Sequence, residues 1–368
     1  MKTHHADNVR IKHKYLGYLK EAKGHAETSL DSVAQALDRF ENYTHLRDFK
    51  AFHPEQAKAF KAHLTGQVSL RSCERLTQAT LYSTLRHLRA FFHWLAGQPG
   101  YRSKLTYADA DYFNLPANDA RIAKTRRASP VPTLEQITHV LATMPSTTDI
   151  ELRNRALVAF AILTGARDGA LASLKLKHVD LAQGHVFQDG RTVATKRGKS
   201  ITTWFFPVGD QPLHIVTEWI EHLRGALLWG NDDPLFPKTR VGVGGTGAFE
   251  ALGLEREFWS SATPIREIFR EGFTRAGLPY FNPHSFRNTL AQLGERRCAN
   301  AEAFKSWSQN LGHEGVLTTL TSYGAVEPAR QAEIMRSMWQ ARTVTDDFVS
   351  RIAVALQQAG FVQSEITG

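Results

Sequence analysis

The chain has 368 residues, enough for about two domains, and its 42% apolar and 22% charged content excludes a disordered protein. The formal charge is +9, and all of the excess lies in residues 1–130, where 21 lysines and arginines accompany 12 acidic residues. A basic module joined to a neutral one indicates a nucleic-acid clamp attached to a second function, although a basic surface can also serve solubility alone.

Three further features narrow the class of protein. The longest apolar stretch, residues 156–163, is too short to span a bilayer, which takes about 20 residues. The N-terminal sequence has no apolar core of a secretory signal. The two cysteines, Cys73 and Cys298, form no CxxC motif and no close Cys/His pair. We therefore expect a protein of the reducing cytoplasm without a disulfide framework, a structural zinc or a membrane partner.

Residues 1–115 predict a helical, cationic domain. Apolar side chains recur there at helical spacing in two stripes. The first stripe is Val33, Leu37 and Phe40, and the second is Leu81, Leu85, Leu88, Phe92 and Leu95. Arg86 and Arg89 fall mostly off the second stripe, so they lie on a cationic side of that helix. Both are candidates for contacts to DNA phosphates, and a merely solvated face is the alternative.

Residues 116–132 predict a basic linker between two domains. They contain three prolines and no hydrophobic periodicity, so we expect an extended segment. Its cations are candidates for crossing a DNA backbone, and they are Arg121, Lys124, Arg126 and Arg127.

A second domain is predicted over residues 133–326, beginning with helices. Thr133 and Gln136 form a capping box, and an apolar helix over residues 152–163 ends at Gly165. Two short strands, HVFQ and RTVAT, are expected to form a hairpin through Asp189-Gly190, with SITTWFF as a third strand.

The rest of the chain predicts a loop followed by more helices. Residues 228–262 are rich in glycine and proline, so we expect a long loop. A helix beginning at Thr263-Pro264 is closed by Gly277, and further helices follow from Pro283. Residues 327–368 predict one or two tail helices.

Several polar residues of the second domain are suited to holding a phosphodiester. Arg167 follows the glycine that ends a buried helix, so its guanidinium is fixed in position and can offer two donors to a phosphate. A salt bridge with Asp168 is the alternative role for this arginine. Lys196 lies at the end of a predicted strand, where a lysine can act as a proton donor or remain solvated. Lys199 competes with it for the same role, and is also a candidate for binding DNA.

The remaining candidates follow in two segments. His284 and Arg287 stand at i and i+3 near a helix start, on one face and at the end that favours anions. His313 follows a predicted helix end at Leu311-Gly312, and Tyr323 lies among small residues rather than in a packed core. Singly, each has an ordinary structural explanation; together they supply cations, imidazoles and a phenol.

The segments TGARDGALASLKLKHVDL, TKRGK, HSFR and LGHEGVLTTLTSYG, in this order, resemble the tyrosine recombinase (phage integrase) family. The resemblance covers nearly all of residues 131–326, and residues 1–115 look like that family's core-binding domain. It implies a mainly α fold with a small β-sheet (α+β): a helical DNA core-binding domain, and a catalytic domain with a three-stranded β-hairpin sheet. The catalytic residues that it implies are Arg167, Lys196, His284, Arg287, His313 and Tyr323.

The resemblance implies a mechanism as well. Tyr323 attacks a DNA phosphorus, forms a 3′-phosphotyrosyl link and releases a 5′-hydroxyl, with His284 as the assisting base. Arg167 and Arg287 stabilise the charge on the non-bridging oxygens, with His313 bonded to one of them. Lys196 protonates the departing oxygen. Arginines then take the place of a metal ion, so no metal and no cofactor are expected.

The implied partners are double-stranded DNA with paired recombination sites and further copies of the chain, assembled as a dimer to tetramer on DNA. The tail at residues 327–368 would dock on a neighbouring subunit, or it simply covers the core of its own domain. A bacterial or phage protein of the cytoplasm, associated with the nucleoid, is the implied setting.

The match to the family has three departures. The family usually has an acidic residue three positions after its first arginine, where this chain has Ala170; Asp168 replaces it, or that support is absent. His313 and Tyr323 are ten residues apart, one more than the commonest family spacing. The predicted loop at residues 228–262 is longer than in compact members.

The sequence is also compatible with two other classes of protein. A type IB topoisomerase would use a similar site to nick and close DNA without pairing two sites. A non-catalytic DNA-binding regulator of the same fold would keep the clamp and lose the chemistry.

Overall fold

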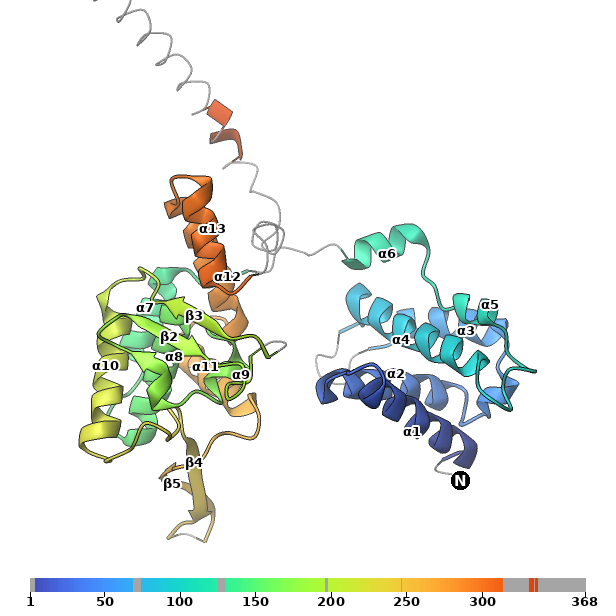
Figure 1. Ribbon diagram of the computed structural model, residues 1–368, viewed down its shortest axis with the longest axis horizontal. Helices are drawn as coiled ribbons and strands as arrows, with labels where there is room; N and C mark the ends of the chain where they lie inside the picture. Colours follow the sequence, from blue (N-terminus) through green and yellow to red (C-terminus); the bar gives the residue numbers. More distant parts are fainter. Residues whose placement is uncertain are drawn as a thin grey trace, which may run out of the picture. The chain divides into compact units, whose positions relative to one another are not determined.

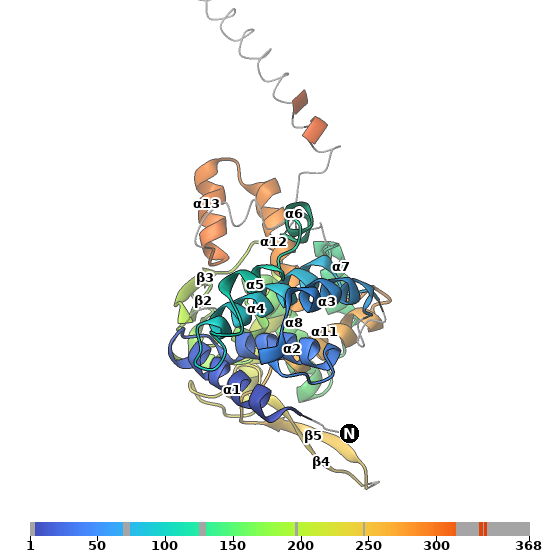
Figure 2. The same cartoon turned by 90° about the vertical axis from the view of Figure 1, so that its right-hand side faces the viewer.

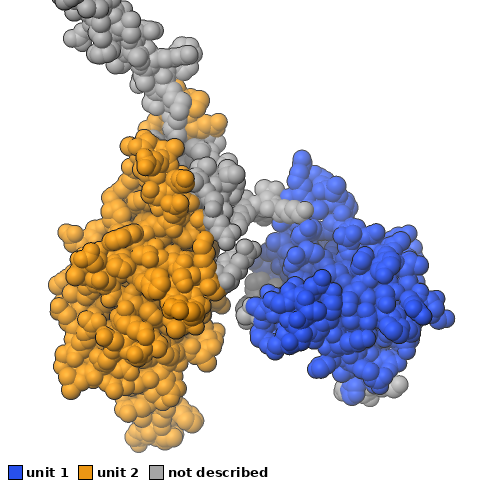
Figure 3. Space-filling model, viewed as in Figure 1, with its two compact units in different colours: residues 1–126 blue, residues 127–368 orange. Residues whose placement is uncertain are grey.

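The structure, a computed structural model, describes residues 4–68, 74–124, 130–195, 198–245, 247–313, 331–333 and 335–336. The chain divides into two compact units, Met1–Arg126 and Arg127–Gly368 (Figure 3). Each unit has its own hydrophobic core. Within the described ranges, no helix combines the length and the apolar character that a membrane span requires.

The first unit is built of helices (Figure 1). The predicted apolar stripes are the buried faces of its second and fourth helices, and the rings of Phe40 and Phe92 meet edge to face at 5.4 Å. Arg86 is exposed on the fourth helix. The elements are α1 (Ala6–Glu21), α2 (Glu27–Tyr43), the 3-10 turn η1 (Phe49–Ala51), α3 (Pro54–Gly66), α4 (Gln78–Ala96), α5 (Tyr107–Asp111) and α6 (Ala117–Lys124).

The prediction of an extended linker is wrong for residues 117–124, which form α6. Pro116 lies just before the helix, where a proline is tolerated, and its carbonyl accepts the first helical bond from Ala120 N–H at 2.9 Å. The alanines of this segment favour a helix, and the other two prolines lie beyond it. Arg121 is exposed on α6 and donates to Asn118 Oδ1 at 3.2 Å.

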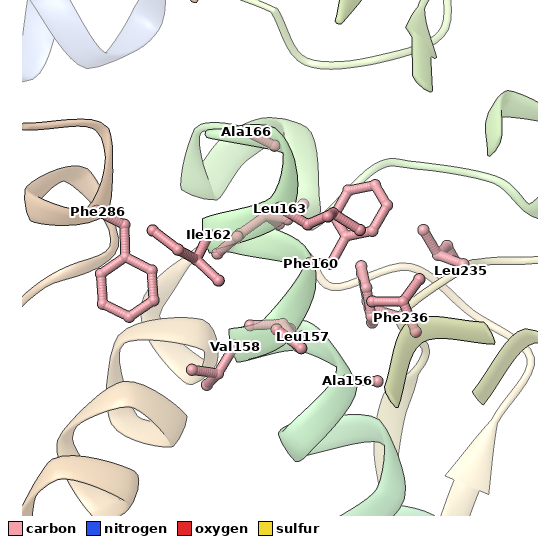
Figure 4. Close-up of a cluster of buried hydrophobic side chains, with 14 of the residues drawn as sticks. Ala156, Leu157, Val158, Phe160, Ile162, Leu163, Ala166, Leu235, Phe236 and Phe286 are labelled. Carbon is pink, nitrogen blue, oxygen red and sulfur yellow. The ribbon is translucent and has the colours of Figure 1, made fainter. Parts of the chain in front are cut away.

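The second unit is arranged around α8, whose residues from 156 to 164 are all buried. Figure 4 shows its side chains between Phe286 of α12 on one side and Leu235 and Phe236 on the other. This is the apolar helix that the sequence predicts. The helices of the unit are α7 (Leu134–Thr143), α8 (Asp149–Thr164), α9 (Asp168–Leu171), the 3-10 turn η2 (Leu176–His178), α10 (Asp210–Gly225), α11 (Thr263–Arg275), α12 (Pro283–Arg297) and α13 (Ala301–Asn310).

A three-stranded antiparallel sheet lies beside these helices, in the order β1 (Val179–Asp180), β2 (His185–Gln188) and β3 (Ile201–Trp204). The prediction that RTVAT pairs with HVFQ is wrong, because β2 pairs with β3 and Gln188 lies opposite Ile201. Asp189 starts a tight turn instead: its carbonyl accepts from the N–H groups of residues 192 and 193, and its carboxylate accepts from Arg191. The chain therefore leaves the sheet at residue 189 and returns at 201. Residues 189–200 are called the lysine loop.

The prediction of a long loop at residues 228–262 is also wrong in part. Two strands, β4 (Lys238–Val243) and β5 (Phe249–Glu255), form a second antiparallel sheet there. Glycines interrupt the alternation of this segment and a bulge shifts its register after Arg240, which hides the strand pattern. Both views place this hairpin at the end of the unit opposite α13 (Figures 1 and 2). Arg153 of α8 anchors its base through hydrogen bonds to Pro237 O at 2.6 Å and Thr239 Oγ1 at 3.0 Å.

Gly165 ends α8 in the left-handed conformation, with φ of 60°, as the sequence predicts. A Cβ on this residue would lie 3.0 Å from Leu290 Cδ1 and 3.1 Å from Leu311 Cδ2. We expect Gly165→Ala to lower the free energy of unfolding by about 1–3 kcal/mol, because alanine is strained at this φ and crowds both leucines. Urea unfolding followed by tryptophan fluorescence measures the change. Gly225→Ala, a site with open space at Cβ, is the control, and equal midpoints for the two variants would contradict the prediction.

Candidate active site

Arg287 occupies the second turn of α12 and is only 3% exposed. The helix begins as predicted: Asn282 caps it by accepting from Ser285 N–H at 3.2 Å, and Pro283 is its first residue. His284 lies one turn before Arg287 on the same side of α12, and its side chain is exposed. The two residues therefore share the end of the helix at which backbone N–H groups favour an anion.

The Arg287 guanidinium joins three segments that are far apart in the sequence. Nη1 donates to the carbonyl of Gly165, at the end of α8. Nη2 donates to the carbonyl of Leu311 at 2.5 Å and lies 3.3 Å from Nε2 of His313. Two of the predicted catalytic residues, Arg287 and His313, are thus within hydrogen-bond contact, and Arg287 also binds the end of the buried helix.

Arg167 lies two residues after the carbonyl that Arg287 binds. It is the N-cap residue of the short helix α9, and it is half-buried. The next residue, Asp168, forms an ion pair with Arg266 of α11, with distances of 2.6 Å from Nη2 and 3.0 Å from Nε to Oδ2. The segment that carries Arg167 is therefore fixed on one side by the buried end of α8 and on the other by α11.

The lysine loop packs beside α9. Ala194 N–H donates to Ser173 Oγ at 2.8 Å, and a Cβ on Gly169 would lie 3.4 Å from Ala194 O. The loop is closed at its foot by a bond of 3.0 Å from Gly190 N–H to Ser200 Oγ. Residue 194 precedes Lys196 by two positions, so the chain leading to this lysine runs next to the helix that follows Arg167.

His178 supports the same loop from η2. Burial, followed by the charges of Lys177 and Lys175, lowers the pKa of His178, which favours the neutral ring. Nδ1 accepts the backbone N–H of Lys175 at 2.9 Å, so the proton of the neutral ring is on Nε2, 3.4 Å from Thr192 Oγ1. This buried histidine holds the loop and is not one of the six predicted catalytic residues.

Two of those six residues, Lys196 and Tyr323, lie outside the described residues, as do Arg126 and Arg127. Lys199, the alternative lysine, is exposed on its loop. Arg89 of the first unit forms an ion pair with Asp111 at 2.8 Å, and both side chains are about half exposed. Lys124 is the last residue of α6. The structure thus brings together four predicted residues: Arg167 and His284 by position, and Arg287 and His313 by direct contact.

Arg266 and Ser173 are residues of this region that the sequence does not reveal. Each makes its contact across the fold, Arg266 to Asp168 and Ser173 to Ala194. Arg266 lies outside the segments that carry the family resemblance, and Ser173 lies inside one of them without being one of the residues predicted from it. Among the residues described, no group of three His, Cys, Asp or Glu side chains is arranged to hold a metal ion.

The family model described as "Phage integrase family" matches residues 131–330, more than half of the chain. The match includes the described residues of the candidate site, from Arg167 to His313. The chain belongs to the phage integrase family. It is an enzyme of the tyrosine recombinase class, with a mainly helical fold and small antiparallel sheets.

Curated relatives and solved structures agree with this assignment. The chain is 25% identical over 253 residues to the tyrosine recombinase XerC of Lactobacillus delbrueckii subsp. bulgaricus, covering 68% of this chain and 73% of that protein. It is 25% identical over 245 residues to XerC of Escherichia coli O157:H7, covering 66% and 69%. Its fold is similar to a lambda integrase dimer bound to a COC′ core site, with a TM-score of 0.59 and 14% identity over 86% of this chain and 94% of that one. The Tn1549 transposon integrase in complex with transposon right end DNA also gives 0.59, at 13% identity over 89% and 99%.

Proposed function

We propose that this recombinase cleaves and rejoins DNA strands through a covalent 3′-phosphotyrosyl link at Tyr323. As a member of its family the chain is a site-specific DNA recombinase. The support for assigning the chemistry to these residues is the bonding of Arg287. It joins the segment leading to Arg167 with the turn that carries His313. Two guanidinium groups and an imidazole then share one small region, which suits a phosphate in its transition state.

The roles follow from the chemistry of each side chain. Arg167 and Arg287 bind the non-bridging oxygens of the scissile phosphate, and His313 donates a further hydrogen bond to them. His284, exposed at the start of α12, takes the proton of the attacking phenol. Lys196 protonates the departing 5′-oxygen, and Lys199 on the same loop is the alternative donor. The 5′-hydroxyl of another strand then reverses the attack, which rejoins the DNA and releases Tyr323.

The proposed substrate is double-stranded DNA that carries paired recombination sites. The proposed location of the reaction is the bacterial cytoplasm. The cations of the first unit and of the segment around α6 contact phosphates, so binding falls steeply with salt. These are Arg86, Arg89, Arg121, Lys124, Arg126 and Arg127, with Lys199 from the second unit. Two to four copies assemble on DNA, as in the lambda integrase dimer on a core site and the lambda integrase tetramer on a Holliday junction. The division into a core-binding domain (1–115), a linker (116–132), a catalytic domain (133–326) and a docking tail (327–368) belongs to the same proposal.

Covalent trapping tests the proposal. The substrate is a nicked duplex carrying a site that the purified protein selects from genomic fragments. Loss of the short fragment beyond the nick leaves no 5′-hydroxyl for rejoining, so the protein–DNA adduct accumulates. We expect wild-type protein to give an adduct whose tryptic map places the nucleotide on Tyr323, with the same yield in EDTA. No adduct, or an adduct on another residue, would contradict the proposed chemistry; loss of the adduct in EDTA would contradict a metal-free reaction.

The other two classes give different outcomes in companion assays. A type IB topoisomerase relaxes supercoiled DNA that lacks the selected site, whereas we expect exchange only between two copies of that site. A DNA-binding regulator protects the site in a footprint and leaves the nicked duplex uncut.

A further inference from the structure

The last residue of α13, Asn310, binds the outer strand of the three-stranded sheet with its side chain. Oδ1 accepts the N–H of Trp204 at 2.7 Å, and Nδ2 donates to the carbonyl of Trp204 at 2.9 Å. Because β3 is the outer strand in the described sheet, these two backbone groups face away from β2. The amide of Asn310 therefore pairs with the strand edge as the backbone of a fourth strand would.

A second contact joins the same two elements. Thr203 Oγ1 donates to the backbone carbonyl of Asn310 at 3.1 Å, and Gln188 Nε2 lies 3.4 Å from Thr203 Oγ1 as its donor. Thr203 and Gln188 are both buried. Gln188 is the last residue of β2 before the lysine loop. Hydrogen bonds thus lead from the foot of that loop to the end of α13.

The turn after Asn310 is fixed by its own backbone. Gly312 has φ of 69°, and its N–H donates to Gln309 O at 2.7 Å, while His313 N–H donates to Ser308 O at 3.2 Å. A Cβ on Gly312 would lie 2.8 Å from Cδ1 of Ile201, so the turn packs directly on β3. The position of His313 therefore follows the position of Asn310.

Arg287 holds the other side of this turn, through Leu311 O and His313 Nε2. The turn thus has two supports, the guanidinium of Arg287 from α12 and the amide of Asn310 from the sheet. We propose that Asn310 is a positioning residue for strand cleavage: it fixes His313, and through β3 it holds His313 in register with the lysine loop. This inference rests on the function proposed above.

The proposed reaction depends on an accurate position of His313. His313 acts by donating a hydrogen bond to an oxygen of the phosphate, and such a bond weakens steeply with a small displacement. Displacement of a reacting group by about 1 Å can cost about 100-fold in rate. Asn310 itself is bonded to the strand backbone, so it acts through His313 rather than on the DNA.

The test is the single-turnover cleavage rate of the nicked duplex at saturating protein. We expect Asn310→Ala to cleave about 10- to 100-fold more slowly than wild type. Its dissociation constant for the uncleaved site should stay within about twofold, since the side-chain amide is bonded to the backbone of Trp204. Gln309→Ala, an exposed neighbour on the same helix, is the matched control and should cleave at the wild-type rate.

A double-mutant cycle separates positioning from a general structural effect. If Asn310 acts through His313, then adding Asn310→Ala to His313→Gln should slow cleavage by less than about threefold further. If Asn310→Ala is too unstable to assay, Asn310→Asp replaces it. The aspartate keeps an acceptor for Trp204 N–H and sets a carboxylate oxygen against Trp204 O, so a slower rate is again expected.

Two results would overturn the inference while leaving the proposed function intact: cleavage by both Asn310 variants at the wild-type rate, or the same loss of rate with and without His313. Failure of wild-type protein to cleave the nicked duplex at all would instead count against the proposed function and the inference together.

Discussion

Replacing Arg287 with alanine is expected to slow strand cleavage by about 100-fold or more and to destabilise the second unit. Loss of a donor to the charge that develops in a transition state costs about 10²–10³ in rate. Arg287 is proposed to be such a donor, and it also fixes the end of α8 before Arg167 and the turn of His313. Its removal therefore disturbs three proposed catalytic groups, so the loss should reach the upper part of that range or exceed it.

The effect on stability has a separate cause. With alanine at this position, the carbonyls of Gly165 and Leu311 lose their buried donor, and an unsatisfied buried polar group costs about 1–3 kcal/mol. We expect urea unfolding to show a loss of this size, and single-turnover cleavage at a temperature where the variant is folded to show the loss of rate.

Two further substitutions serve as a control for Arg287→Ala and as a test of whether the positive charge alone is sufficient. Arg296→Ala removes an exposed arginine from the same helix and should leave the cleavage rate unchanged. Arg287→Lys keeps the positive charge, but an ammonium group lacks the planar fork that reaches Gly165 O and Leu311 O while facing a phosphate. It should recover little of the rate. Near-normal cleavage by Arg287→Ala would remove this residue from the proposed site.

The features that the sequence predicts correctly are those set by local chemistry. Thr133 and Gln136 form the expected capping box, Gly165 has the positive φ that ends α8, and α13 ends just before Leu311-Gly312. Each depends on a few adjacent residues whose side chains satisfy backbone groups or tolerate a left-handed conformation. The apolar stripe of α4 is predicted correctly for a similar reason. Its helical spacing can be recognised from the sequence without knowing which elements pack against it.

The strand pairing could not be predicted in the same way. Asp189-Gly190 has the composition of a two-residue hairpin, but the Asp189 carboxylate accepts from the backbone and side chain of Arg191 and closes a different turn. β2 then pairs across a long loop with β3, a choice that depends on how both strands pack within the second unit. The β4–β5 hairpin is likewise hidden by its glycines and its bulge.

The candidate site shows the same division. Arg167, His284, Arg287 and His313 are recognisable because they recur in an ordered set of short segments, which a family resemblance can detect. The hydrogen bonds that bring these segments together run from Arg287 to the backbone carbonyls of residues 165 and 311. Every residue has a backbone carbonyl, so the sequence does not show which ones accept these bonds. Arg266 and Asn310 contribute through tertiary contacts alone, so only the folded arrangement reveals them.

Tyr323→Phe carries the largest effect that we expect. The variant keeps the aromatic ring and lacks the oxygen that is proposed to attack phosphorus, so no phosphotyrosyl link can form. Removing the nucleophile of an enzyme that works by covalent catalysis costs several orders of magnitude in rate. We therefore expect no adduct on the nicked duplex and no strand exchange, with the affinity for the uncleaved site within about twofold of wild type.

Tyr280→Phe is the matched control for the loss of a phenolic oxygen. Tyr280 is a partly exposed tyrosine of the same unit, and its ring lies under the Arg270 guanidinium at 4.6 Å, a contact that phenylalanine keeps. This control should cleave the duplex at the wild-type rate. An adduct formed by Tyr323→Phe would mean that another side chain attacks the DNA, whereas weak binding by this variant would mean that Tyr323 holds the substrate before any bond is broken. Only loss of the adduct with binding intact identifies Tyr323 as the nucleophile, because only the chemical step then depends on its oxygen.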